Sequence, residues 1–113
     1  SWVEHEHLIN SVTALAGSGP AYFFLMIEAM IEAAIDQGLE PNTARDLALQ
    51  TARGAAELAN SSDEAPSLLR ARVTSPKGTT DAAIKSFERE GLRTIVKNAM
   101  EACRKRADEL ASQ

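Results

Sequence analysis

The residues best suited to bind a small molecule gather in the segment RVTSPKGTTDAA, residues 72–83. Gly78 allows a ligand to approach the backbone closely. The segment ends where a helix is predicted to begin, and the first amides of a helix lack internal acceptors at the positive end of its dipole. The sequence therefore predicts either an anion site or a simple helix-capping loop. The candidate residues are Ser75, Pro76, Lys77, Gly78, Thr79 and Thr80.

Other familiar catalytic motifs do not fit this sequence. Ser18 lies in GSGP, but a nucleophile elbow needs the spacing G-x-S-x-G between a strand and a helix. Neither the P-loop pattern nor the glycine fingerprint of dinucleotide-binding domains occurs. The sequence therefore excludes the usual nucleotide-binding loops from this chain.

Metal binding and acid–base chemistry receive little support from the residue spacing. His5 and His7 are two residues apart and point to different sides of a helix, so no metal site is predicted. Glu28, Glu32 and Asp36 follow one another at four-residue intervals. This spacing favours a solvated stripe on a helix over a pair of catalytic carboxylates.

Composition restricts the classes of partner. The 113 residues carry a net charge of −4, which argues against binding to nucleic acid or to an anionic membrane surface. No run of 18 uncharged apolar residues occurs, so no membrane span is expected. The N-terminus lacks the pattern of a secretory signal, and the one cysteine, Cys103, cannot form an internal disulfide. These features favour a reducing, cytoplasmic location.

Hydrophobic periodicity predicts an all-α fold of six helical segments in one domain, residues 1–113, with no strand. AGSGP at 16–20 is expected to break the chain between the first two helices, with Pro20 at the first helical position. Gly38 is expected to end the second helix, and Glu40 or Asn42 to cap the third. The expected helices cover residues 5–15, 20–37, a third that opens within 39–46 and continues to 59, then 66–72, 80–90 and 92–110.

Two of these helices carry further predictions. The second is apolar around most of its circumference, which a chain of this size cannot cover, so we expect a second chain to bury it in an extensive dimer. The last helix has an apolar stripe on which Cys103 is expected to be a buried, inert thiol. Its pairs Arg104/Asp108 and Lys105/Glu109 are expected to form a solvated face.

Two motifs about fifty residues apart resemble those of pyrroline-5-carboxylate reductases. They are VTALAGSGPAY at 12–22 and VTSPKGTT at 73–80, and the resemblance continues through 37–39, 50–56 and the C-terminal helix. It covers essentially the whole chain. The family has an N-terminal Rossmann domain for NAD(P)H and a C-terminal helical domain, like that of 6-phosphogluconate dehydrogenase-like reductases, which forms an interlocked dimer. The chain resembles only the helical domain, without the Rossmann domain.

The resemblance implies a function for the parent enzyme: NAD(P)H-dependent reduction of Δ1-pyrroline-5-carboxylate to L-proline, the last step of proline biosynthesis. It implies that the loop matching Ser75–Thr80 holds the substrate carboxylate, and that Thr80 is a candidate to bond the ring nitrogen. The segment matching Ser18, Gly19 and Pro20 is implied to lie near the nicotinamide. The helical domain alone is expected to be inactive, and the preference for NADP or NAD lies in the absent domain.

The sequence departs from the family pattern at three positions, and two alternative hypotheses about its function remain open. Lys77 stands where a glycine is common, so either this position does not need a positive φ or the loop differs locally. Ala16 replaces a frequent serine, and Glu90 interrupts a usual Gly-Gly pair. The rivals are a non-catalytic helical dimerisation module and the helical domain of a related dehydrogenase that acts on another small acid. A homodimer is expected, with a higher oligomer left open.

Overall fold

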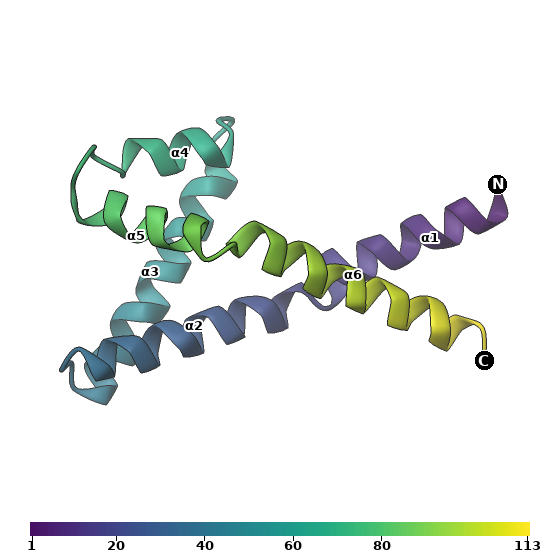
Figure 1. The fold of residues 1–113 in the computed structure, drawn as a ribbon, viewed down its shortest axis with the longest axis horizontal. Coiled ribbons are helices and arrows are strands. Elements are labelled where there is room, and N and C mark those ends of the chain that lie inside the picture. Colours follow the sequence, from purple (N-terminus) through teal and green to yellow (C-terminus); the bar gives the residue numbers. More distant parts are fainter. The chain divides into compact units, whose positions relative to one another are not determined.

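All elements of the chain are helical in a computed structural model that describes residues 1–113 (Figure 1). The six predicted helical segments and the absence of strands are thus confirmed, and the fold is all-α. The elements in order are α1 (Trp2–Val12), the π-helix η1 (Thr13–Gly17), α2 (Gly19–Asp36), α3 (Pro41–Ser61), α4 (Pro66–Arg72), α5 (Thr79–Arg89) and α6 (Leu92–Ala111).

The predicted break at 16–20 is wrong in its extent. Helical structure continues through η1, and Ser18 alone separates it from α2. The Ser18 amide donates to the Thr13 carbonyl at 2.9 Å, a wide turn of the π type. Pro20, at the second position of α2, has no amide and disfavours an ordinary α-helical turn before it. The chain therefore widens one turn where the sequence predicted a loop.

The end of α2 confirms the role predicted for Gly38. Its φ of 106° is left-handed, a conformation that glycine adopts without a steric penalty. The Leu39 amide donates to the Ala34 carbonyl at 3.1 Å, which closes the turn as in a Schellman motif. α2 therefore ends where a single glycine reverses the chain direction.

Glu40, one of the two predicted caps, begins α3. Its carboxylate accepts from the Thr43 amide at 3.0 Å and from the Thr43 hydroxyl at 3.2 Å. Hydrogen bonds from the backbone amides of Asn42 and Thr43 lower the pKa of the Glu40 carboxyl group. The charged form of Glu40 thus stabilises the first turn of α3.

This cap predicts a pH dependence. Because the folded-state pKa of Glu40 lies below its unfolded value, the stabilisation is complete above the unfolded pKa and is lost as the pH falls through the folded pKa. We expect the first turn of α3 to fray over that acidic range. NMR chemical shifts of Thr43 and Ala44 followed against pH would measure it. Glu40→Gln should remove this pH dependence, and an unchanged titration in that variant would contradict the assignment.

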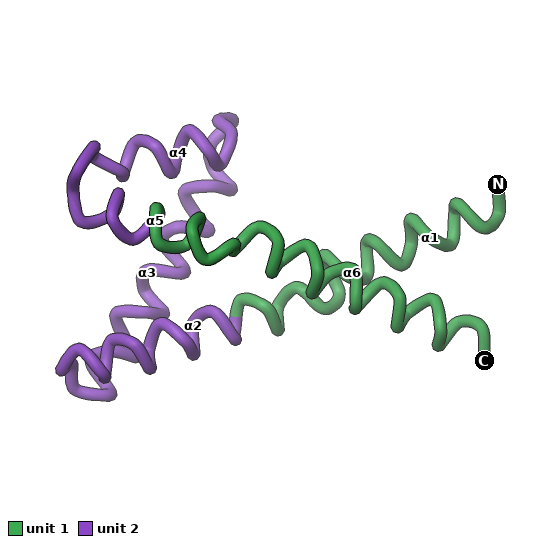
Figure 2. Tube along the Cα trace, in the orientation of Figure 1, with its two compact units in different colours: residues 1–23, 85–113 green, residues 24–84 purple.

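The chain divides into two compact units (Figure 2). Unit 1 comprises residues 1–23 and 85–113, and unit 2 comprises residues 24–84. Helices α2 and α5 each contribute to both units.

Unit 1 is built by α1, η1 and α6, which pack against one another. Ala14 of η1 is its buried apolar residue, at 2% exposed. Polar contacts join α1 to α6: Asn10 Nδ2 donates to Asp108 Oδ1, and Arg104 Nη1 lies 2.9 Å from His7 Nδ1. The side chain of Arg104 is only 15% exposed and pairs with Asp108 at 2.6 Å. The predicted pairing of Arg104 with Asp108 is confirmed, and Lys105 and Glu109 are exposed as predicted, but the expectation that Arg104 is solvated is wrong because it packs on α1.

Unit 2 contains no pair of helices that packs extensively. Its one buried apolar residue is Ala44, at 1% exposed. Large apolar side chains of α2 lie in solvent, with Phe24 68% and Leu25 65% exposed. Glu28, Glu32 and Asp36 are exposed too, as predicted for the charged stripe. Unit 2 therefore lacks a hydrophobic core of its own.

The exposed surface is large for a chain of this size. The accessible area is 8980 Å², whereas a folded monomer of 12.1 kDa exposes about 6,000 Å². The difference is about 3,000 Å² per chain, or about 6,000 Å² over two chains, which lies at the upper end of obligate interfaces. The predicted dimer is therefore consistent with the exposure of single apolar residues and with the total accessible surface area of the chain.

One helical stretch bears on the expectation of no membrane span. The helical stretch 2–36 contains an 18-residue window with a mean hydropathy of 1.4, so by length and composition alone it could cross a membrane. The sequence count considered only uncharged runs and did not detect it. The core helix of a soluble protein passes the same test, so the finding is weak evidence for a membrane.

Candidate functional site

The predicted anion loop forms a tight turn before α5, within unit 2. The Gly78 amide donates to the Ser75 carbonyl at 3.0 Å, which closes a four-residue turn with Pro76 and Lys77 at its centre. Lys77 has a φ of 62° and is the one non-glycine residue with a left-handed backbone. Proline followed by a left-handed residue is the pattern of a type II turn. The turn therefore keeps the geometry that glycine favours, although this chain has lysine there.

The same turn explains why the next residue is glycine. A Cβ added to Gly78 would lie 3.2 Å from the Ser75 carbonyl oxygen, closer than ordinary van der Waals contact. Any larger side chain would push against the acceptor of the hydrogen bond that closes the turn. Gly78 thus avoids a tight contact within the turn.

Lys77 predicts a measurable effect on stability. A left-handed non-glycine residue costs about 1–2 kcal/mol, and glycine loses about 0.5–1 kcal/mol more conformational entropy on folding. We therefore expect Lys77→Gly to raise the free energy of unfolding by about 0.5–1 kcal/mol. Lys77→Val should lower it, because a β-branched residue tolerates positive φ poorly. Denaturant unfolding at one fixed protein concentration measures both, and a destabilised Lys77→Gly variant would contradict the strained turn.

The backbone amides of this segment divide into two pairs. The Lys77 amide donates to the Asp81 carboxylate at 3.1 Å, and the Gly78 amide is used in the turn. The amides of Thr79 and Thr80 open α5, where no earlier helical carbonyl can accept from them. Both threonines are exposed. The acceptor-free amides of the candidate site are therefore those of Thr79 and Thr80.

The second candidate segment, Ser18-Gly19-Pro20, lies in unit 1 after the π-helix. Ser18 is half-buried and Gly19 is buried. No non-neighbouring atom lies within 4 Å of the place where a Cβ on Gly19 would stand. π-type turns are frequent at functional sites. The π-type turn at Thr13–Gly17, which the sequence did not predict, thus sets the backbone path that leads into Ser18–Pro20.

A polar cluster connects this segment to α6. The Cys103 thiol donates to Ser18 Oγ at 3.2 Å, and the Tyr22 hydroxyl donates to the Ala14 carbonyl at 2.6 Å. The hydrogen bond with Cys103 raises the pKa of Tyr22, and hydrogen bonds with Ser18 and Tyr22 lower the pKa of the Cys103 thiol. Cys103 is half-buried, so the prediction that this thiol is buried is wrong, whereas its inertness stays a prediction.

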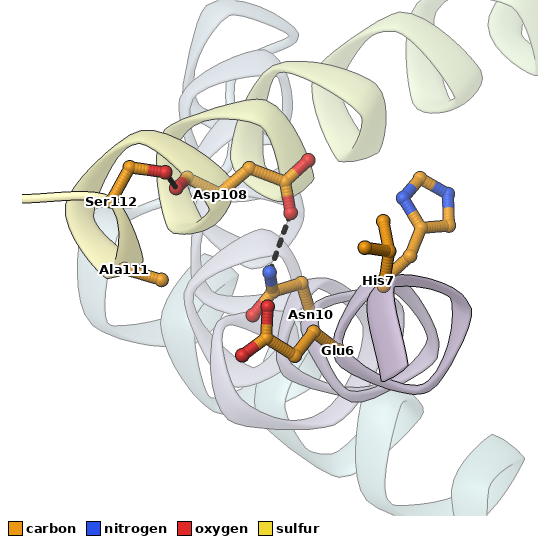
Figure 3. Close-up of a pocket in the computed structure, with 7 residues that line it drawn as sticks. Glu6, His7, Asn10, Asp108, Ala111 and Ser112 are labelled. Carbon is orange, nitrogen blue, oxygen red and sulfur yellow. Dashed lines mark hydrogen bonds between the residues drawn. The ribbon is translucent and has the colours of Figure 1, made fainter. Parts of the chain in front are cut away.

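Unit 1 also holds a polar hollow of about 200 Å³ between α1 and the end of α6 (Figure 3). Asp108 faces it from α6, and its Oδ1 accepts the hydrogen bond from Asn10 that Figure 3 marks. His7 and Glu6 lie on the α1 side. Asp108 is already paired with Arg104. The sequence missed this hollow because its two sides are nearly a hundred residues apart.

The structure thus places the predicted residues in two local settings. Ser75–Thr80 come together as one turn and helix start in unit 2, and Ser18–Pro20 form the junction of η1 and α2 in unit 1. The described hollows lie in unit 1 and are not lined by the loop residues. The residues that sequence reasoning missed at the site are Cys103 and Tyr22.

Comparisons with known proteins agree on one family. The family described as pyrroline-5-carboxylate reductase dimerisation matches residues 6–110. The pyrroline-5-carboxylate reductase of Pseudomonas aeruginosa is 53% identical over 112 residues, which cover 99% of this chain and 41% of that protein. That of Corynebacterium melassecola is 47% identical over 102 residues, covering 90% of this chain and 38% of that protein.

Solved structures give the same result. A pyrroline-5-carboxylate reductase from Coxiella burnetii matches with a TM-score of 0.89 and 46% identity, over 92% of this chain and 38% of that one. The pyrroline carboxylate reductase of Plasmodium falciparum, solved with NADP bound, matches with a TM-score of 0.85 and 34% identity, over 89% of this chain and 38% of that one. The chain spans roughly two fifths of the length of these relatives.

Proposed function

Because this chain belongs to the pyrroline-5-carboxylate reductase dimerisation family, we propose that it is the dimerisation and substrate-binding part of an enzyme that reduces Δ1-pyrroline-5-carboxylate to L-proline. The observation that carries the proposal is the start of α5, where a tight turn leaves the amides of Thr79 and Thr80 without an acceptor. A carboxylate is the ligand that such a helix start favours.

The substrate carboxylate is held by Thr79 and Thr80 in this proposal. Both residues belong to the first turn of α5, at the positive end of its dipole, and Ser75 adds a hydroxyl group at the start of the preceding turn. Asp81 restricts the site, since its carboxylate takes the Lys77 amide and repels a second anion. The two threonines therefore make the hydrogen bonds to the substrate carboxylate, and Pro76, Lys77 and Gly78 shape the turn before them.

Thr80 is the candidate catalytic residue. Its hydroxyl group is exposed beside the proposed carboxylate site, and it would bond the ring nitrogen as the imine becomes an amine. Holding the substrate in one orientation lowers the entropic part of the barrier. The other residues of the turn act on the substrate carboxylate alone.

The cofactor, NADP or NAD, would meet this chain at Ser18, Gly19 and Pro20. Gly19 is buried, and no atom outside its own helix backbone and chain neighbours stands within 4 Å of its Cβ position. The bound nicotinamide would supply the hydride. Ser18 contributes a hydroxyl group at the same junction. The remaining contacts to the cofactor belong to a Rossmann domain outside this chain.

A homodimer completes the proposal. The apolar face of α2 needs a partner, and a second copy of the chain supplies an equally apolar one. The family is described by its dimerisation, which supports this reading. We propose a cytoplasmic, proline-forming enzyme, whose helical part is inactive without the cofactor domain.

The proposal is tested by assay of the full-length protein that contains this chain. We expect oxidation of NADPH or NADH, followed by absorbance, that depends on Δ1-pyrroline-5-carboxylate and yields proline. Oxidation only with another small cyclic or acidic substrate would point to a related dehydrogenase. A dimer without any such activity, and without chemical-shift changes at residues 75–80 on titration with proline, would leave only a dimerisation module.

A further inference from the structure

His7 of α1 contacts a charged side chain of α6, the helix at the other end of the sequence. Its Nδ1 lies 2.9 Å from Nη1 of Arg104, which is 97 positions away. The guanidinium group is held on its own helix, because Glu101 and Asp108 both pair with it and the Arg104 side chain is only 15% exposed. Arg104 therefore presents a fixed N–H group to α1.

The chemistry of the two groups fixes the protonation state of His7 in this contact. An arginine guanidinium group donates hydrogen bonds and cannot accept one. Nδ1 of His7 must therefore be the acceptor, so the imidazole is neutral and carries its proton on Nε2. A protonated imidazole has an N–H group at both nitrogens and would place a second positive charge against the guanidinium group.

Charged groups from both helices surround His7. They are Arg104, Glu101 and Asp108 of α6, Lys105 beside Glu101, and Glu6 of α1. The π-helix η1, which also packs on α1, carries no titratable side chain. Arg104 pairs with both carboxylates of α6, and Asn10 also donates to Asp108. A protonated His7 thus meets a cation, whereas the carboxylates of α6 are already paired with that same cation.

We propose that His7 is a pH-dependent latch, which holds α1 on α6 when the imidazole is neutral and releases it when the imidazole is protonated. Histidine is the side chain that changes charge between about pH 5 and 8. The hydrogen bond from Asn10 to Asp108 contains no histidine, and it holds the next turn of α1 in either charge state of His7. Release therefore loosens the N-terminal turns of α1 and leaves the end that leads into η1 attached.

Hydrogen exchange of the full-length protein that contains this chain tests the latch. Mass spectrometry of peptides from α1, at about pH 8 and about pH 5.5, gives protection factors once the intrinsic exchange rates are corrected for. Because a solvent-exposed polar contact contributes modestly, we expect the protection of α1 to fall by about 2–5-fold at the lower pH. His7→Gln offers an amide oxygen to Arg104 at every pH and should keep the higher protection at both. His7→Ala offers no acceptor and should show the lower protection at both.

His5→Gln is the matched control. His5 is the other histidine of the chain, and its ring lies beside the ring of Trp2. This variant should keep the pH response of the wild type. NMR of isotope-labelled histidine supplies a second readout, since the neutral His7 ring should carry its proton on Nε2 alone.

Three results would overturn the latch. Equal protection of wild-type α1 at the two pH values would show that the carboxylates of α6 hold the protonated imidazole equally well. A fall in protection that persists in His7→Gln would assign the pH response to another group. A neutral His7 protonated on Nδ1 would rule out the hydrogen bond from Arg104 on which the latch depends.

Discussion

Replacing Phe24 with aspartate is expected to dissociate the dimer and to leave a chain that loses most of its helical structure. Phe24 is 68% exposed on α2 in the single chain, and unit 2 has no helix pair to replace a lost partner. A carboxylate buried in an apolar interface costs about 3 kcal/mol or more. Two-fold symmetry repeats that cost, so the dissociation constant should rise by about 10⁴-fold.

Light scattering coupled to size exclusion measures the mass, and circular dichroism measures the helical content. Glu32→Gln is the matched control, because it alters an exposed residue on the charged stripe of the same helix. It should remain dimeric and helical. A Phe24→Asp variant that stays a helical dimer would place α2 outside the interface. Wild-type protein that requires detergent and partitions into lipid vesicles would instead assign residues 2–36 to a membrane.

Thr80→Ala in the full-length enzyme is expected to lower kcat/KM by about 10–100-fold. A hydrogen bond to a charged or developing charged group contributes about 1.5–3 kcal/mol, and each 1.4 kcal/mol corresponds to a factor of ten. Thr80 lies exposed in the first turn of α5, so its methyl and hydroxyl groups add little to folding. The free energy of unfolding should change by less than about 0.5 kcal/mol.

Thr80→Ser keeps the hydroxyl group and provides the matched control. It should retain most of the activity, which steady-state kinetics with varied Δ1-pyrroline-5-carboxylate would show. The melting temperatures of all three proteins, measured at one concentration, exclude a folding defect as the cause. Turnover at the wild-type level in Thr80→Ala would refute the role proposed for this residue.

Local chemistry explains why much of the fold could be predicted. Helix boundaries follow from short-range features, such as Gly38 with its left-handed backbone and Glu40 with its cap. The apolar circumference of α2 was enough to predict that its surface needs a partner, and the exposure of Phe24 agrees with that. The turn at Pro76–Lys77 also depends on short-range features, because four consecutive residues set its geometry.

Contacts between distant residues explain what could not be predicted. Arg104 and Asp108 follow a spacing that is equally typical of a solvated helix face, and only the packing of α1 on α6 buries Arg104. Cys103 looks like any small apolar residue until α6 brings it to Ser18. The wide turn at Thr13–Gly17 depends on how the chain accommodates Pro20, which periodicity does not reveal.

The sequence by itself determined the all-α class, the helix ends, the position of the turn before α5 and the need for a second chain. Each of these depends on backbone preferences or on apolar surface, which neighbouring residues set without distant help. Only the tertiary structure decided that Cys103 bonds Ser18 and that Arg104 joins α6 to α1. Those features depend on which helix faces pack together and which donors remain unpaired.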